Sequence, residues 1–105
     1  MSDMSGKLIV AVDPLIAALV PGFLANRAAD VDRIRAALVA GDFGLIRAAA
    51  HGMKGAGGGY GFPEISRLGA AMEESAGRRD ADAIAGLVAS LEEYLGRVEI
   101  RFGGE

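Results

Sequence analysis

The segment LIRAAAHGMKGAGGGYGF, residues 45–62, decides the fold and holds the only histidine of the 105-residue chain. When it is placed on a helix at about 100° per residue, Leu45, Ala49, Met53 and Ala56 form one apolar stripe. His51 lies opposite this stripe, so its side chain should face water. We therefore expect a helix that packs through one face and exposes the histidine on the other.

The face of His51 also carries two cations. Arg47 precedes the histidine by four residues and Lys54 follows it by three, and both spacings bring side chains onto one helix face. The glycines that share this face are Gly44, Gly55 and Gly58. An accessible imidazole between two cations, without bulky neighbours, is suited to binding an anion. The pattern indicates a site for a phosphate group.

Glycine is concentrated here beyond what helix propensity favours, since five glycines fall within residues 52–59. Each costs a helix interior about 1 kcal/mol relative to alanine. Either the helix frays into a loop near Gly57, or the bare backbone lets another surface approach closely. We expect both, with fraying between Gly58 and Gly61 and the close approach of a partner at Gly55.

The run His51-Gly-Met-Lys54-Gly55-Ala56, followed by Tyr60-Gly61, resembles the H-x-x-K-G signature of histidine-containing phosphotransfer (HPt) domains. These domains carry phosphoryl groups between receiver domains in phosphorelays. The resemblance extends over roughly residues 13–102. It includes the Gly-Asp-Phe turn at 41–43, a final amphipathic helix, and the series Ile65, Leu68, Met72 and Glu73.

The resemblance implies a phosphorelay intermediate that accepts a phosphoryl group on the outer ring nitrogen of His51. Lys54 would stabilise this group, and Gly55, Gly58, Arg47 and Gly44 would contact the docked partner. The implied partners are response-regulator receiver domains and a histidine kinase or hybrid kinase. The chain would need no cofactor of its own, because Mg²⁺ is expected on the receiver domain.

The remaining sequence predicts an all-α, up-down-up-down four-helix bundle with a short additional N-terminal helix. Leu8 to Val12 reads as an extended segment, and Asp13 with Pro14 starts a short helix that ends before Pro21. Long helices are expected over residues 22–40, from Asp42 through His51, over residues 63–77, and from Asp80. The stripe of the last helix is Ile84, Leu87, Val88, Leu91, Leu95, Val98 and Phe102.

Tyr60 and Phe62 are expected to close the core beneath the glycine-rich loop. The main apolar positions of the helix over residues 22–40 are Leu24, Ala28, Val31, Ile34 and Leu38. Because one core uses all these stripes, we expect a single domain over residues 1–105, with its core at 13–102, and a monomer. Met1 suggests a free-standing protein.

Composition excludes several classes of partner. The net charge is −3, so there is no basic surface for nucleic acid or for an anionic membrane. The chain has no cysteine, which excludes disulfides and fits the reducing cytoplasm.

Other kinds of site also fit poorly. The glycines of residues 52–61 match neither the dinucleotide fingerprint nor the phosphate-binding loop of nucleotide-binding proteins. One histidine supports no metal site. Glu73 and Glu74 read as a solvated face, and His51 has cations rather than an orienting carboxylate beside it, so no catalytic triad is expected.

Two functions stay open. In the first, the chain is a phosphocarrier without an ATP site or kinase activity. In the second, it is a helical adaptor that docks receiver or kinase domains without being phosphorylated. The presence of both His51 and Lys54 favours the carrier, because a docking module needs neither.

Overall fold

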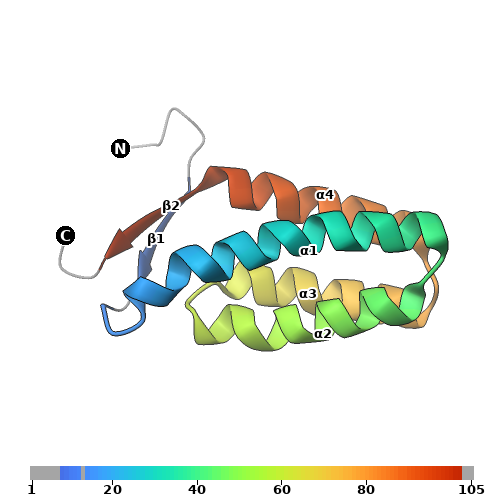
Figure 1. Ribbon diagram of the computed structural model, residues 1–105, viewed down its shortest axis with the longest axis horizontal. Coiled ribbons are helices and arrows are strands. Elements are labelled where there is room, and N and C mark those ends of the chain that lie inside the picture. The colour runs from blue at the N-terminus through green and yellow to red at the C-terminus, as the bar shows by residue number, and fades with distance from the viewer. Residues whose placement is uncertain (1–7, 13, 103–105) are drawn as a thin grey trace.

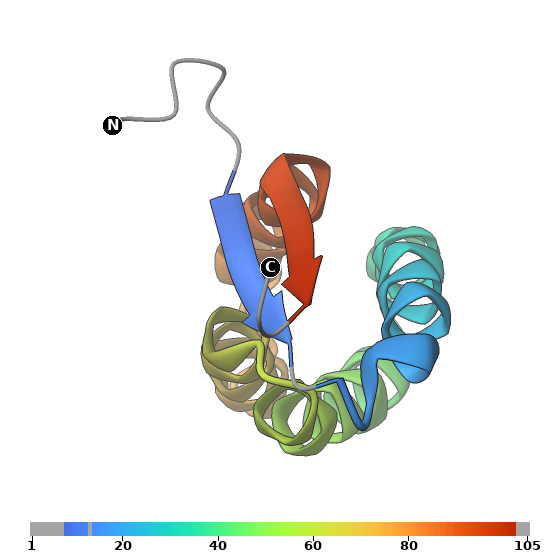
Figure 2. The same ribbon diagram turned by 90° about the vertical axis from the view of Figure 1, so that its left-hand side faces the viewer.

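A computed structural model describes residues 8–12 and 14–102, and it confirms the predicted four-helix bundle (Figure 1). The helices are α1 (Val20–Ala40), α2 (Phe43–Gly59), α3 (Pro63–Gly77) and α4 (Ala81–Arg97). Each helix packs against the next one in the chain, and α1 also contacts α4, which closes the ring (Figure 2). No helix in the described ranges has the length and hydrophobicity needed to cross a membrane.

The turns between helices follow the sequence signals. Gly41 ends α1 with a left-handed backbone (φ 71°), a conformation that favours glycine. The side chain of Asp42 then accepts a hydrogen bond from the backbone N–H of Leu45 at 3.0 Å. Asp80 caps α4 in the same way. The two helices expected to start at Asp42 and Asp80 do start there, and each aspartate satisfies a donor that the first helical turn leaves free.

The short helix expected to end before Pro21 is present as a single 3₁₀ turn, η1 (Ala17–Leu19), which leads directly into α1. Pro21 lies within the first turn of α1. A proline is tolerated there because the N–H groups of the first turn have no partner in the helix. The predicted cap Asp13 lies outside the described residues.

Two strands lie side by side at one end of the bundle (Figure 2). The extended segment predicted at β1 (Leu8–Val12) is confirmed, and it pairs in parallel with β2 (Val98–Phe102). Leu8 is opposite Val98, and Val12 is opposite Phe102. The expected continuation of the last helix to Phe102 is therefore wrong, because a strand partner takes up the backbone from Val98 onward.

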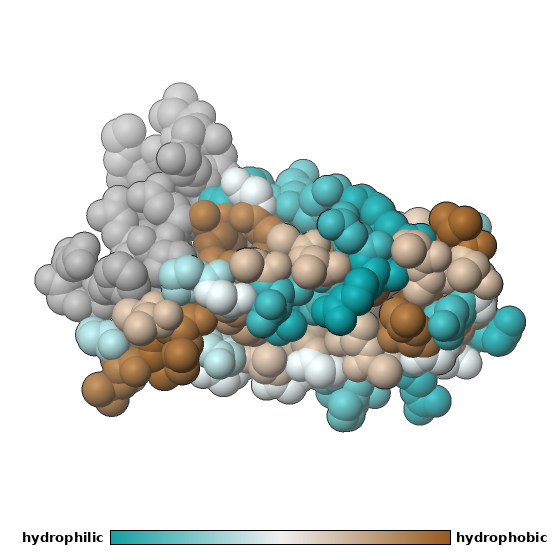
Figure 3. Space-filling view, in the orientation of Figure 1, coloured by the Kyte–Doolittle hydropathy of each residue, from teal (hydrophilic) through white to brown (hydrophobic). Residues whose placement is uncertain are grey.

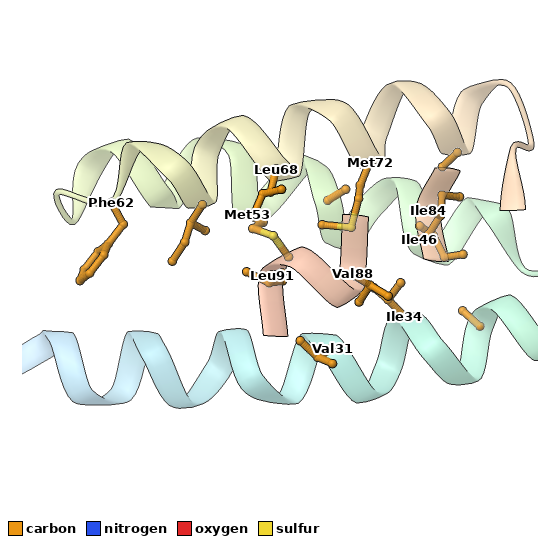
Figure 4. Packing of buried hydrophobic residues seen from close by; sticks show 14 of the residues in the cluster. Val31, Ile34, Ile46, Met53, Phe62, Leu68, Met72, Ile84, Val88 and Leu91 are labelled. Atoms are coloured by element: carbon orange, nitrogen blue, oxygen red, sulfur yellow. The ribbon is translucent and has the colours of Figure 1, made fainter. Parts of the chain in front are cut away.

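The core lies between all four helices (Figure 4). Phe62 is fully buried, and the ring of Phe23 stacks on Tyr60 at 4.5 Å and on Phe62 at 5.5 Å. The prediction that Tyr60 and Phe62 close the core is thus confirmed. The largest fully buried side chains are Phe62, Ile34, Ile46, Met53, Ile65, Leu68, Met72, Ile84, Leu91, Val20 and Val88.

The buried stripe of α2 differs from the predicted one. It consists of Ile46, Ala50, Met53 and Gly57, whereas Leu45 is 42% exposed. Alanines lie on several faces of α2 itself, so the sequence pattern did not distinguish the buried stripe from one shifted by a single residue. Exposed hydrophobic groups of the face in Figure 3 lie mainly toward the two ends of the bundle, with hydrophilic residues between them.

Helices α2 and α3 form the closest pair, and two glycines allow this. A Cβ at Gly57 would lie 2.6 Å from the backbone nitrogen of Ser66. A Cβ at Gly69 would lie 2.7 Å from the backbone nitrogen of Lys54 and 2.9 Å from the carbonyl oxygen of Ala50. The two backbones therefore touch directly. The Ser66 hydroxyl adds a hydrogen bond to the carbonyl oxygen of Lys54.

This packing overrides the local preferences of the glycines. The helix α2 continues through Gly58 to Gly59, and Tyr60 caps it. The turn is made by Gly61, with φ 87°. The fraying expected between Gly58 and Gly61 is therefore limited to the end of that range, because contact with α3 holds the helix.

Candidate functional site

His51 lies on the exposed surface of α2, and its side chain is 69% accessible. Its Nδ1 atom is 2.8 Å from Oε2 of Glu73 on α3. Within residues 8–12 and 14–102, this is the one hydrogen bond of the ring. Since an ionised carboxylate can only accept, Nδ1 carries the hydrogen. In the neutral imidazole the other nitrogen, Nε2, then carries the lone pair and is open to a reaction partner.

The carboxylate of Glu73 bridges the two residues of the predicted motif. Its Oε1 atom is 2.9 Å from Nζ of Lys54, while Oε2 is bound to His51. Hydrogen bonds from Lys54 first, and from His51 second, lower the pKa of the Glu73 carboxyl below its ordinary value. Glu73 is therefore ionised at neutral pH, and it links α3 to both residues on α2.

This contact overturns two sequence-based interpretations. Glu73 belongs to the site and not to a solvated face, since its side chain is only 21% exposed. His51 does have an orienting carboxylate beside it, contrary to the expectation that only cations surround it. Glu74 fits the original interpretation, because its exposed side chain pairs with Arg78.

Sequence spacing alone could not reveal Glu73. It lies 22 residues from His51, and the contact depends on how closely two helices approach. Glu73 belonged to the series on which the family resemblance rests, and a second signal was present, since Gly69 lies four residues earlier and so on the same face of α3. A glycine and a carboxylate one turn apart, flanking buried Met72, mark the side of α3 that faces α2.

His51, Lys54 and Glu73 form the histidine cluster. Arg47 lines the same groove as Lys54 and Glu73. The groove has a volume of about 470 Å³, and it lies between α2 and α3. Its lining residues are Arg47, Lys54, Ala70, Glu73, Glu74 and Gly77. The structure thus brings Arg47 to the same side of α2 as Lys54.

The predicted docking glycines have space around them. A Cβ at Gly55 would meet no atom of the described residues within 4 Å, so its bare backbone serves no contact inside the bundle. At Gly44 and Gly58 a Cβ would make ordinary contacts, at 3.7 Å, with side-chain oxygens of Asp42 and Ser66. Among the described glycines, Gly57 and Gly69 are the ones at which a Cβ would collide with the backbone of the neighbouring helix.

The other side of α2 differs in character. A second groove, of about 490 Å³, runs between α1 and α2 and is lined on α2 by small and apolar residues, Gly52 and Leu45 among them. On α1 it is bordered by buried Asp30, which pairs with Arg27 at 2.8 Å and also with Arg33. No sequence pattern indicated that Asp30 would be buried.

The arrangement supports nucleophilic chemistry at one nitrogen. A neutral imidazole with Nδ1–H held by a carboxylate presents the lone pair of Nε2, and an imidazole nitrogen can attack phosphorus. The ammonium of Lys54 lies one turn away. Among the residues that the structure describes, no group of three or more acidic or histidine side chains could hold a metal ion.

Comparison with known proteins bears on the same residues. The family model described as Hpt domain matches residues 18–100, which is most of the chain. This range includes all four helices and every residue of the cluster. No curated protein and no solved structure matched the chain.

Proposed function

Because the chain belongs to the Hpt domain family, whose members are phosphocarriers of two-component signalling, we propose that His51 carries the phosphoryl group. The carrier accepts this group from, or passes it to, the aspartate of a response-regulator receiver domain. The observation that carries the proposal is the contact of Nδ1 with Glu73, which leaves Nε2 exposed and nucleophilic.

Transfer to the carrier is a displacement at phosphorus. The lone pair of Nε2 forms the N–P bond, the bond from phosphorus to the aspartate oxygen breaks, and its electron pair stays on the released carboxylate. Catalysis of such a step requires mainly positioning and neutralisation of the phosphoryl oxygens. Lys54 supplies a positive charge one turn from His51, and Arg47 supplies a second charge in the same groove.

The receiver domain completes the site. It provides the aspartate, and we expect it to provide Mg²⁺, so the carrier needs no cofactor of its own. The open surface at Gly55 supports close approach of that partner, because a side chain there would stand beside the histidine. We propose that Gly44 and Gly58 border the same contact.

The same proposal covers the upstream partner and the location. A histidine kinase or hybrid kinase would supply the phosphoryl group, directly or through its own receiver. Such partners place the carrier in the cytoplasm. We propose that it acts as a monomer, since the apolar faces of all four helices meet in one core.

A docking adaptor without phosphorylation is the alternative. It would use the same exposed surface, but it gives no reason for the Glu73 contacts with His51 and Lys54. The two functions differ in one property, the covalent labelling of His51.

Phosphoryl transfer from a phosphorylated receiver or hybrid kinase to the purified protein tests the proposal. Wild type should acquire label that is lost in acid and survives alkali, as expected of a phosphohistidine. His51→Gln should acquire none while its helical circular dichroism is unchanged, because the side chain is exposed. Absence of transfer from a broad panel of donors to folded wild type would favour the adaptor.

A further inference from the structure

The strand pair at one end of the bundle leaves an edge open. In the described ranges β1 pairs with β2 alone, and the two strands contact each other far more than they contact any helix. In Figure 2, β2 lies toward α1, and the other edge of β1 faces away from both. Backbone N–H and C=O groups along such an edge are a template for pairing with another chain.

The residue pattern of the two strands indicates which of them belongs inside a larger sheet. β1 reads Leu-Ile-Val-Ala-Val without a polar residue, whereas β2 reads Val-Glu-Ile-Arg-Phe and alternates between apolar and charged residues. Continuous apolar runs are typical of strands in the middle of a sheet, and charges are typical of strands at its edge. β1 is therefore suited to the centre of a sheet, yet among the described strands it has one neighbour.

We propose that a second copy of this chain supplies the missing neighbour, so that two β1 strands pair antiparallel across a two-fold axis. The resulting order, β2-β1-β1-β2, places both continuous apolar strands inside and both charged strands outside. A sheet joined through β2 would instead leave the apolar strands at its edges, where they favour further association. Two copies thus complete the sheet without any other protein, and the two-fold axis closes the assembly.

The sequence of β1 matches itself in this arrangement. When the pairing is centred on Val10, this residue lies opposite its own counterpart, Ile9 lies opposite Ala11, and Leu8 lies opposite Val12. Every opposed position is apolar, and like charges, which destabilise a strand pair when they are directly opposite, do not meet. All five residues of the strand therefore take part in the pairing.

The same end of the bundle exposes apolar side chains outside the sheet. Leu15 is 91% exposed and Leu19 is 56% exposed, and both lie in the segment that connects β1 with α1. Exposed apolar surface beside the open edge favours association at this end. The dimer should still be weak, because two five-residue strands bury less than the roughly 1,200 Å² of a stable interface.

The dimer adds an interface outside the helical core and leaves each bundle a complete carrier. The histidine cluster of each copy lies on its own α2 and α3, so each bundle transfers phosphoryl groups as a monomer does. β1 precedes the residues that the Hpt family model matches, 18–100, so membership of the family accounts for the carrier and not for this strand. The proposal is therefore independent of the phosphoryl chemistry and can fail without it.

Disulfide crosslinking tests the order of the strands, since the chain has no cysteine of its own. Under mild oxidation Val10→Cys should form a linked dimer, because opposed residues of antiparallel strands have Cα atoms about 5 Å apart. The matched control is Ile100→Cys, at the position of β2 that is in register with Val10. Its two copies would lie three strand spacings apart, about 14 Å, whereas a disulfide requires less than about 7 Å.

Val10→Cys should therefore crosslink about tenfold faster than Ile100→Cys, or more. Equal rates, or faster crosslinking of Ile100→Cys, would overturn the proposed sheet.

Sedimentation velocity measures the association without an added cysteine. The dimer fraction of wild type should rise over about a hundredfold range of concentration up to about 1 mM. Val10→Lys puts two like charges opposite each other at the two-fold axis, so it should weaken association about tenfold or more. Val10→Thr, which keeps a strand-forming residue without charge, should associate within about threefold of wild type.

Helical circular dichroism checks that the bundle of each variant is folded. Wild type that stays monomeric throughout the concentration range would overturn the proposal, and so would a dimer that Val10→Lys leaves intact.

Discussion

The glycine at position 69 should respond to alanine in the direction opposite to an ordinary helical glycine. In the interior of an exposed helix, replacement of glycine by alanine stabilises by about 1 kcal/mol. At Gly69 the new Cβ would lie 2.7 Å from the backbone nitrogen of Lys54 and 2.9 Å from the carbonyl oxygen of Ala50. Both atoms belong to the backbone of α2, so no side-chain rotation relieves the overlap.

The magnitude follows from the required displacement. Ordinary contact begins at 3.4 Å, so α2 and α3 must separate by about 0.7 Å at this level. Overpacking of this kind costs about 1–3 kcal/mol, and the rigid backbone neighbour puts Gly69→Ala near the upper end. After the gain in helix propensity, we expect a net loss of about 2 kcal/mol in the free energy of unfolding. In a domain of this size that corresponds to about 10 °C in the melting temperature.

The assay is thermal and urea unfolding followed by circular dichroism, with Gly86→Ala as the matched control. Gly86 lies in α4, and a Cβ there would meet nothing within 4 Å among the described residues. The control should therefore melt a few degrees above wild type, in line with the gain of about 1 kcal/mol.

Gly69→Ala should also slow phosphoryl transfer. Glu73 lies one turn along the same helix, so separation of the helices stretches its contacts with His51 and Lys54. A displacement of this size at a reacting group can reduce the rate about tenfold or more. If Gly69→Ala melts at or above the wild-type temperature, the close packing of α2 on α3 is not what the glycine provides, and the reasoning is refuted.

Two further changes probe the partner surface and a buried phenol. Gly55→Leu should leave the melting temperature within a few degrees of wild type, because the new side chain would point into open space. It should nevertheless weaken receiver binding measured by titration calorimetry. Equal binding by the variant and wild type would contradict a close approach of the partner at this position. Burial first, and the negative charge of Glu64 second, raise the pKa of Tyr94 above 10.0. The neutral phenol thus contributes stability that is complete below the unfolded-state pKa and is lost as the pH rises through the folded-state pKa. Urea unfolding between pH 8 and pH 11 should show a steeper alkaline loss for wild type than for Tyr94→Phe, and parallel curves would rule out this contribution.

Local signals in the sequence predicted most of the bundle. The N-caps Asp42 and Asp80 and the terminator Gly41 act within one turn of chain, so their effect can be read without tertiary information. The first-turn proline Pro63 behaves likewise. The placement of His51 on an exposed helix face depended only on helical spacing, and the structure has it there.

The features that were missed are those that depend on a neighbouring element. The contact of Glu73 with His51 exists because α2 and α3 approach closely. This approach is possible because Gly69 has no side chain at the point where α3 lies against the backbone of Lys54. The change from helix to strand at Val98 likewise requires β1 as a partner. In α2, alanines on several faces concealed which stripe is buried: Ile46 is fully buried, whereas Leu45, a side chain of the same size, is 42% exposed.

The pairing of β1 with β2 has a consequence for the order of folding. Most helix contacts are between neighbours in sequence, and α1 with α4 is the exception. Leu8 and Val98 meet across about 90 residues, and closing a free loop of that length costs about 4 kcal/mol in chain entropy. Because this pairing spans the longest stretch of chain, we expect the strand pair to form after the helices and to open before them. The two ends of the bundle's chain can thus separate in a local opening while the helices, and the histidine between them, keep their arrangement.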